Sequence, residues 1–357
     1  MLHTDKMLHI DGRMGEGGGQ LLRTSLSLSA LTGRPFRITH LRANRDRPGL
    51  RPQHLTAVRA VGRLCGAALS GDAIDSRTLE FRPAMPPQPG IYHFDVSDAT
   101  AGGSAGAVTL ILGAVLWPLL FAAGRSHVTL RGGTHVPMSP PWHYVAHVAR
   151  PAFAHMGATF TTELAAWGWY PAGGGVVTAE IQPVTRLDAP AFAHIPVERV
   201  EGVAAVTNLP ADIPQRMAGR AANLLSTAGR PSRIEPRREK GAGPGAGIFL
   251  WVPQGGFGAI GRPGLPSEKV AEAAVAETLS FVDNNAMVDR HLADQLLLPL
   301  ALAHGHARYT TDHLTLHTIT NADLLRQWLD IRIDITGDLG GPAEIDMTGA
   351  GFTASKS

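Results

Sequence analysis

The sequence predicts a protein of the α/β (α+β) class. Strand-like and helix-like segments alternate along the chain. In the strand-like segments apolar and polar residues alternate, and in the helix-like segments apolar residues recur every three or four positions. Of the 357 residues, 44% are hydrophobic and 17% are charged, which is enough to bury one or two cores and too apolar for a disordered chain. This alternation argues against an all-helical or an all-β architecture.

In the first half of the chain, a strand, a turn and a helix follow one another repeatedly. The helix expected at 53–68 shows the pattern best, because Leu55, Val58, Val61 and Leu64 fall three residues apart on one face. The other elements expected in this half are strands at 7–11, 36–41, 92–96 and 128–130 and a helix at 20–31.

The most apolar segment, 107–123, is also expected to be a helix. A bilayer span needs roughly 17 to 25 apolar residues, and Thr109, Gly113 and Pro118 interrupt this one. We therefore interpret it as a helix buried between sheets and expect no membrane association.

A change of composition marks a smaller inserted domain at 185–264. This region is rich in proline and contains the glycine-rich run 240–245. The larger domain then comprises 1–184 and 265–357. Within its second part, we expect a helix from Ser267, as N-cap, to Val282, an apolar helix at 292–303, and strands near Leu314 and Ile331.

Several kinds of chemistry lack the residues that they need. Cys65 is the only cysteine, so the chain has no internal disulfide and no cysteine-based metal site. Neither the G-x-S-x-G nor the H-E-x-x-H motif is present. The single cysteine and the absence of a secretory signal predict a cytoplasmic location.

The charges are distributed unevenly along the chain. Between Arg23 and Arg63 there are nine arginines and one acidic residue, Asp46, although the formal net charge of the chain is only +2. Arginine suits phosphate oxygens, so this stretch is either a surface for a polyanion or an ordinary solvated face.

Two glycine-rich turns, 15–19 and 102–106, directly precede helical segments. The free N–H groups at a helix start favour an anion, whereas tight turns also need glycine for positive φ angles. Neither turn matches a P-loop or a dinucleotide fingerprint.

The segment 312–321 carries two histidines. If 314–318 is a strand, His317 shares a face with His313 and Thr315. A neutral imidazole there can attack phosphorus and form a phosphoramidate, but a purely structural histidine fits the same pattern.

Five blocks of the sequence, taken together, resemble the RNA 3′-terminal phosphate cyclase family. In chain order they are 15–23 (GEGGGQLLR), 47–55 (RPGLRPQHL), 170–175 (YPAGGG), 292–296 (LADQL) and 317–321 (HTITN). Their order and spacing cover almost the whole chain, and the similarity is looser over the inserted region.

This resemblance implies a fold and an activity. The fold is a large domain of repeated α/β units, each a small sheet with two helices, and an inserted smaller thioredoxin-like α/β domain. The activity is the ATP-dependent conversion of an RNA 3′-phosphate into a 2′,3′-cyclic phosphate, through a histidine–AMP intermediate and an RNA adenylate, with Mg²⁺ or Mn²⁺. The expected partner is RNA with a 3′-phosphate end.

The resemblance also assigns roles to single residues. His317 would be the nucleophile, and Glu16 would bind the metal ion. The adenosine of ATP would be bound by six residues: Pro141, His291, Leu292, Ala293, Asp294 and Gln295. RNA and phosphate groups would be bound by five residues: Arg23, Arg42, Arg45, Gln53 and His54.

Three positions depart from the family pattern as we understand it. His291 stands where a tyrosine is usual, Gly113 where a glutamine contacts the nucleotide, and Trp167 where a basic residue is usual. Two other functions remain open: a non-catalytic RNA-binding relative that serves ribosome assembly, and a transferase of similar architecture such as an enolpyruvyl transferase. Adenylylation of 5′-phosphate ends also remains open.

Overall fold

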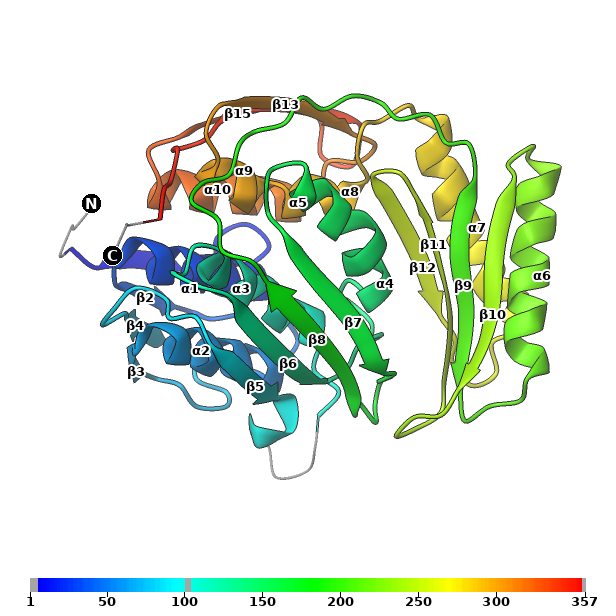
Figure 1. Cartoon of the computed structure of the whole chain (residues 1–357), viewed down its shortest axis with the longest axis horizontal. Coiled ribbons are helices and arrows are strands. Elements are labelled where there is room, and N and C mark those ends of the chain that lie inside the picture. Colours follow the sequence, from blue (N-terminus) through cyan, green and yellow to red (C-terminus); the bar gives the residue numbers. More distant parts are fainter. Residues whose placement is uncertain (1–5, 100–103, 355–357) are drawn as a thin grey trace.

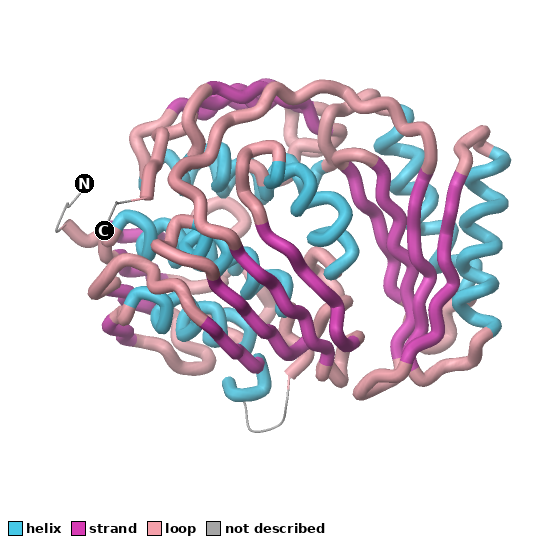
Figure 2. Tube along the Cα trace, viewed as in Figure 1, coloured by secondary structure: helices cyan, strands magenta, loops and turns pink. Residues whose placement is uncertain are grey.

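A computed structural model describes residues 6–99 and 104–354 of the chain. Four small sheets and their helices form the molecule, and the chain order of these elements makes three related units and one inserted layer (Figure 1). The sheets lie on the outside and most helices of the three units lie inside (Figure 2). Residues 102 and 103 of the second glycine-rich turn fall outside the described residues.

The first unit has the order strand, helix, strand, helix, strand, strand. Strands β1 and β2 are parallel, with α1 as the crossover, and the other pairs are antiparallel, in the sheet order β1-β2-β4-β3. Its elements are β1 (Leu8–Asp11), α1 (Gly19–Thr32), β2 (Phe36–Thr39), α2 (Pro52–Cys65), β3 (Ala68–Ser70) and β4 (Leu79–Arg82).

The second unit repeats this topology, with the sheet order β5-β6-β8-β7. Its second helix is divided into three short helical segments, of which the middle one is a π-helical turn. Its elements are β5 (Ile91–Asp95), η1 (Val96–Ala99), α3 (Val108–Leu120), β6 (Ser126–Gly132), α4 (Trp142–Tyr144), η2 (Val145–Ala149), α5 (Arg150–Ala154), β7 (Phe160–Ala166) and β8 (Gly175–Ile181).

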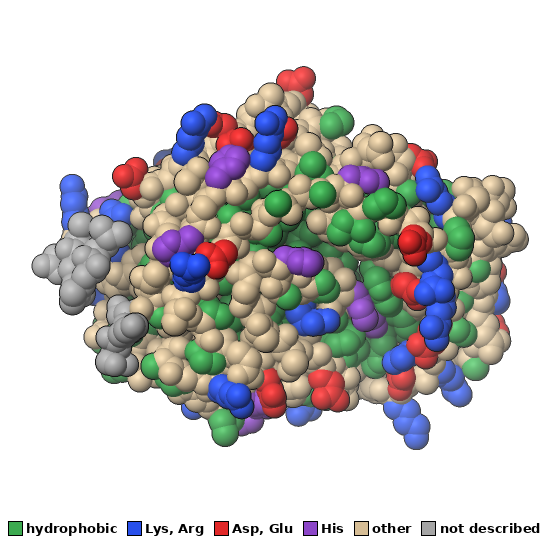
Figure 3. Space-filling model, turned by 45° about the horizontal axis from the view of Figure 1, so that its top comes forward, with side chains coloured by type: hydrophobic (Ala, Val, Ile, Leu, Met, Phe, Trp, Pro, Cys, Tyr) green, Lys and Arg blue, Asp and Glu red, His purple; other side chains and the backbone are tan. Residues whose placement is uncertain are grey.

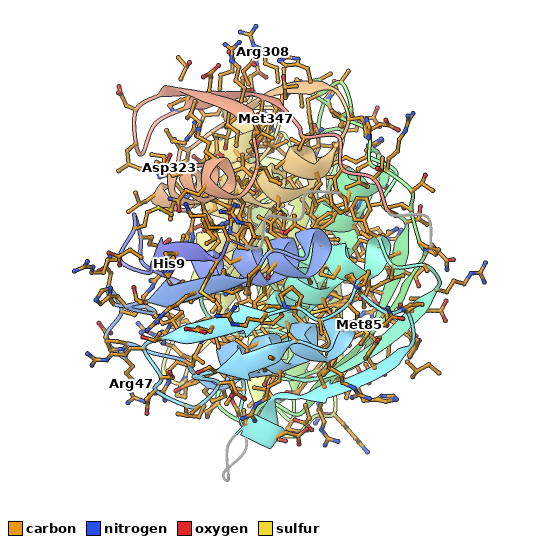
Figure 4. The ribbon with its side chains drawn as sticks, turned by 90° about the vertical axis from the view of Figure 1, so that its left-hand side faces the viewer. His9, Arg47, Met85, Arg308, Asp323 and Met347 are labelled. Atoms are coloured by element: carbon orange, nitrogen blue, oxygen red, sulfur yellow. The ribbon has the colours of Figure 1, made fainter. Side chains whose placement is uncertain are left out.

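The third unit lacks a full first strand. Its sheet order is β13-β15-β14, and a parallel bridge from Val288 to Thr311 stands where the first strand lies in the other units. Its elements are α8 (Arg290–Gln295), α9 (Leu297–Leu302), β13 (His306–Thr311), α10 (Leu316–Trp328), β14 (Arg332–Gly337) and β15 (Ala343–Thr348). Seen from the side, this unit covers the first unit (Figure 4).

The inserted layer is a sheet of order β10-β9-β11-β12 with α6 and α7 packed on one face. Parallel β9 and β10, joined by α6, and antiparallel β11 and β12 agree with the expected thioredoxin-like topology. Its elements are β9 (Val200–Thr207), α6 (Asp212–Thr227), β10 (Ser232–Glu239), β11 (Gly245–Val252), β12 (Gly255–Ile260) and α7 (Ser267–Asp283). Helix α7 shares its buried core with this sheet, although its residues lie after the boundary expected at 264.

Helices α1 and α3 lie at the centre of the larger core. Leu22, Leu26 and Leu28 of α1 are fully buried, and the Ser27 hydroxyl donates to the carbonyl oxygen of Ala114 in α3 at 2.9 Å. The apolar segment at 107–123 is thus the buried helix that we expected. Among the helices of 6–99 and 104–354, none is both long and apolar enough to cross a bilayer.

Two predictions about the last third of the chain were wrong. The segment 314–318 is not a strand, because Thr315 caps α10: its hydroxyl accepts a hydrogen bond from the backbone N–H of Thr318 at 3.1 Å. The buried positions Thr318, Asn321 and Leu325 then follow a helical period. The apolar helix expected at 292–303 is divided into α8 and α9 at Leu296.

Candidate active site

A cavity of about 750 Å³ lies between the inserted layer and the three units. Side chains from α1, α3, α8 and α10 line one side of it, and β11 and β12 line the other. The residues predicted for the site that line this cavity are Arg23, Pro141, His291, Asp294, Gln295 and His317.

His317 lies in the first turn of α10, and 43% of its side chain is exposed. Its Nδ1 lies 2.8 Å from Oε1 of Gln20, and Nε2 of the same amide donates to Oδ1 of Asp294. Because the carboxylate fixes the orientation of the amide, Oε1 of Gln20 accepts and Nδ1 of His317 must carry the hydrogen. In the neutral imidazole, Nε2 therefore keeps its lone pair.

Asp294 is held in place by further contacts. Its Oδ1 also accepts from Nδ2 of Asn321 at 3.2 Å, and Oδ1 of Asn321 accepts from the Thr24 hydroxyl at 3.1 Å. Burial raises the pKa of Asp294. The groups behind His317 thus form a connected hydrogen-bond network that restricts both the ring and its tautomer.

Glu16 approaches His317 from the first glycine-rich turn. Its Oε2 lies 2.7 Å from Nε2 of His317, and its Oε1 accepts from the guanidinium of Arg45. The turn needs its glycines: Gly15 and Gly17 have φ angles of 55° and 61°. The backbone N–H of Glu16 donates to the hydroxyl of Thr320 at 3.1 Å, so the turn is attached to α10.

A divalent cation fits beside Glu16. Oε2 of Glu16 is buried and makes no hydrogen bond within the described residues, although Nε2 of His317 lies 2.7 Å away. A carboxylate oxygen and a ring nitrogen that keeps its lone pair repel each other at this distance, and Mg²⁺ or Mn²⁺ bound beside them would relieve the repulsion. No group of three or more histidine, cysteine or acidic side chains in the described ranges is arranged to hold a metal. Glu16 would therefore supply one carboxylate ligand, and phosphate and water oxygens would complete the coordination.

Three arginines of the basic stretch surround this turn. Burial lowers the pKa of Arg23 to about 10, so the residue stays cationic at neutral pH. Arg45 contacts Glu16, and the guanidinium of Arg42 donates to the carbonyl oxygens of Arg47 at 2.7 Å and Gly49 at 3.0 Å. Arg42 thereby braces the loop behind the site, while Arg23 reaches the cavity.

Gln53 and His54 make structural contacts. Oε1 of Gln53 accepts from the backbone N–H of Ala107, the N-cap of α3, at 2.8 Å. Nδ1 of His54 accepts from the backbone N–H of Arg51 at 3.3 Å, which caps α2. Burial, followed by the charge of Arg23, lowers the pKa of His54 well below its ordinary value, so its ring is neutral. Neither residue lines the cavity within the part of the chain that is described.

Helix α8 presents one face to the cavity. Side chains of His291, Asp294 and Gln295 line it, whereas Leu292 and Ala293 are fully buried in the core. Asp289 caps the helix: its Oδ1 accepts from the backbone N–H groups of His291 at 2.7 Å and Leu292 at 2.8 Å. An aspartate directly before a helix is a sequence signal for this cap, so Asp289 could have been recognised from the sequence.

Asp289 also connects the inserted layer to the second and third units. Its carboxylate accepts from the backbone N–H of Gly256 in β12 at 2.8 Å and from the hydroxyl of Tyr144 in α4 at 3.0 Å. Burial raises the pKa of Asp289. One buried carboxylate therefore fixes three elements around the cavity.

The departures from the family pattern have separate locations. Gly113 lines the cavity, and a Cβ added there would meet open space. His291 also lines the cavity. Trp167 is buried, stacks on His135 at a ring distance of 4.4 Å, and does not line the cavity within the described residues.

The arrangement is suited to nucleophilic attack on phosphorus. A ring nitrogen with a free lone pair faces the cavity, a carboxylate able to hold a cation lies beside it, and an arginine supplies positive charge. The start of α10 adds backbone N–H groups that favour an anion near His317.

Comparisons with known proteins point to one family. A family model described as RNA 3′-terminal phosphate cyclase matches residues 14–335. A protein of that name from Nostoc punctiforme is 50% identical over 327 residues, which make up 90% of this chain and 94% of that protein. Proteins of the same name from Methylococcus capsulatus and Methanosarcina barkeri are 46% and 41% identical, over 92% of this chain and 93% and 96% of their own lengths.

A solved structure is more distant. The enolpyruvyl transferase NikO from Streptomyces tendae aligns over 96% of this chain and 49% of its own, with 12% sequence identity and a TM-score of 0.35. A likeness at that level has no bearing on the reaction.

Proposed function

The chain belongs to the RNA 3′-terminal phosphate cyclase family, and from this premise we propose that it cyclises RNA 3′-phosphates with ATP through a covalent adenylate of His317. The observation that carries the proposal is the position of the imidazole: Nε2, with its lone pair set by the hydrogen bond from Nδ1 to Gln20, faces the cavity beside Glu16.

In the first step, Nε2 of His317 attacks the α-phosphorus of ATP. A nitrogen–phosphorus bond forms, the bond from the α-phosphorus to the bridging oxygen breaks, and pyrophosphate leaves. The imidazole becomes cationic in this step, and its Nδ1–H remains bonded to Gln20, which is itself bonded to Asp294. The negative charge of Asp294 behind Gln20 stabilises that cation.

In the second step, an oxygen of the RNA 3′-phosphate attacks the same phosphorus and releases His317. The 2′-hydroxyl next to the activated phosphate then attacks it, closes the ring and expels AMP. Activation by adenylylation replaces a poor leaving group with AMP, and the ring closure is intramolecular, so positioning supplies much of its rate.

The other residues of the site support binding. Glu16 would hold Mg²⁺ or Mn²⁺, which neutralises phosphate charge when bound. Arg23 and Arg45 would contact phosphate oxygens. His291, Gln295 and Pro141 would border the adenosine, with the imidazole of His291 stacking on the base. Leu292 and Ala293 would shape this pocket only through their backbone, because their side chains are buried in the core.

A direct assay tests the proposal. Purified protein is incubated with ATP, Mg²⁺ or Mn²⁺ and an RNA that carries a labelled 3′-phosphate, and the label is then tested for release by a phosphomonoesterase. We expect the label to become resistant, because a cyclic phosphate is a diester, and resistance to require ATP. Label that stays sensitive with both metals would reject cyclisation and favour the non-catalytic RNA-binding alternative. We propose a cytoplasmic location as well, consistent with the single, buried Cys65.

A prediction about nucleotide choice concerns Gly113. In Gly113→Gln, the new side chain enters open space in the cavity and offers an amide to the base. One added hydrogen bond contributes about 0.5–1.5 kcal/mol, so the preference for ATP over GTP in self-adenylylation should rise roughly three- to tenfold. Gly113→Ala is the matched control, since it adds the Cβ without the amide. An equal preference in the two variants would show that this position does not face the base.

A further inference from the structure

A set of aromatic rings joins the second unit to the inserted layer. The ring of His147, in the π-helical turn η2, stacks on Trp251 of β11 with centroids 4.0 Å apart and an interplanar angle of 5°. Trp142 packs edge-on against His147 at 6.1 Å. These three residues, Trp142, His147 and Trp251, are called the stacking platform below. A π-helical turn is rare and is frequent at functional sites.

The platform is open to solvent on one side and continuous with the cavity on the other. His147 is exposed, and Trp142 and Trp251 are half-buried. Trp251 also lines the cavity that holds His317, together with His143 and Phe249. Figure 3 shows histidine and hydrophobic side chains side by side in a hollow between the two parts of the molecule. A chain that leaves the cavity along this wall would meet His147 next.

The charges around the platform suit a polyanion. Partial burial, followed by the charge of Arg150, lowers the pKa of His147, so its ring is uncharged at neutral pH and offers a π face. Arg150 forms no ion pair with a carboxylate of the described residues. Arg237 of β10 is close enough to His143 for its charge, after burial and the charge of His147, to lower the pKa of that residue, but its guanidinium is paired with Glu235 at 2.9 Å. Arg150 is therefore the better candidate to contact phosphate. Uncharged rings bordered by cations are the usual features of a single-strand binding groove.

We propose that the stacking platform binds the nucleobases that precede the 3′-terminal nucleotide of the RNA. The inference rests on the proposed function, since it requires the terminal phosphate to lie at His317. Proteins bind single-stranded RNA by stacking splayed bases on aromatic rings. Stacking needs no particular base, so the platform adds affinity for RNA of any sequence. The adenine of ATP is assigned to other residues of the cavity, His291, Gln295 and Pro141, of which Pro141 directly precedes Trp142 in the chain.

The test compares short and long ligands in the absence of ATP. Fluorescence anisotropy measures the affinity of wild type and of His147→Ala for a labelled oligoribonucleotide that carries a 3′-phosphate. The affinity of each protein for a nucleoside 3′-phosphate is measured by competition with the labelled oligoribonucleotide. We expect His147→Ala to bind the oligonucleotide about tenfold more weakly, because one stacked base is lost, and the nucleoside 3′-phosphate with unchanged affinity. His147→Phe, which keeps a ring, should restore most of the affinity.

Controls separate this inference from the proposed function. His155→Ala removes another exposed histidine, eight residues further along the chain and not among the residues that line the cavity, and should bind like wild type. Equal oligonucleotide affinity in wild type and His147→Ala, or no affinity in either, overturns the inference. A selective rise in the KM for ATP would also overturn it, because adenine would then occupy the platform. Because binding is measured without ATP, a weaker oligonucleotide complex supports the platform even if the wild type proves unable to cyclise RNA.

Discussion

His317→Ala is expected to abolish the covalent adenylate. Two other histidines of the described residues line the cavity, His143 and His291, but the contacts to Gln20 and Glu16 that prepare a nucleophile are made by His317. Loss of a covalent nucleophile costs about 10⁴-fold or more in rate. The measurement is incubation with α-labelled ATP and Mg²⁺ or Mn²⁺ without RNA, followed by denaturation at mildly alkaline pH, since a phosphoramidate is labile in acid. Wild type should retain the label and the variant should not.

The matched control for this experiment is His306→Ala. His306 is exposed on β13 in the same unit, and its Nε2 pairs with Asp346 at 2.9 Å, far from the network behind His317. Label retained by His317→Ala at the wild-type level would contradict the assignment of the nucleophile. Cyclisation of RNA should fall in parallel with the label, because the second step uses the adenylate made in the first.

Gln20→Leu is expected to slow self-adenylylation by about 10²-fold to 10³-fold without removing any reacting atom. Leucine has a similar size but can neither accept from Nδ1 of His317 nor donate to Asp294. The imidazole then populates both tautomers and more than one orientation. A wrong tautomer or a misplaced ring lowers the rate of the chemical step. The loss should be in kcat, with the KM for ATP nearly unchanged. Nitrogen NMR of His317 should report the change of tautomer directly.

The same substitution at an exposed glutamine is the control. Gln327 is exposed near the end of α10, and its side-chain amide donates a hydrogen bond to the sulfur of Met14 at 3.2 Å. The control variant is Gln327→Leu. This variant should react like wild type. If Gln20→Leu keeps the wild-type rate, the hydrogen bond to Nδ1 does not select the tautomer, and the role given to Gln20 is wrong.

The local pattern of the sequence was sufficient for most elements. Leu21, Leu22, Leu26 and Leu28 predicted α1, and the alternation at 36–41 predicted β2, because periodicity follows directly from burial. The pattern gave the wrong element at 314–318, where two local signals conflict. Leu314, Leu316 and Thr318 alternate as in a strand, but the Thr315 hydroxyl caps a helix. A hydroxyl cap is a local signal, and it has to be weighed against the apolar pattern.

The sequence predicted single residues of the site but not the contacts between them. Motif resemblance pointed to His317, Glu16 and Arg23, which the structure brings together. The contact between Gln20 and His317 joins residues 297 positions apart, so no local pattern reports it. Gln53 and His54 belong to the arginine-containing motif 47–55, yet their side chains bind backbone groups at the starts of α3 and α2. A motif thus identifies residues without separating those that meet substrate from those that hold the loop.

The three α/β units contribute different groups to one cavity. Glu16 and Gln20 come from the first unit, Gly113 and Pro141 from the second, and the α8 residues and His317 from the third. The first unit is synthesised before the third and can fold early, whereas His317 follows Gln20 by 297 positions. A polypeptide that stops before His317 therefore carries the carboxylate and the amide without the reactive ring. On the proposed mechanism, such a fragment cannot form the adenylate.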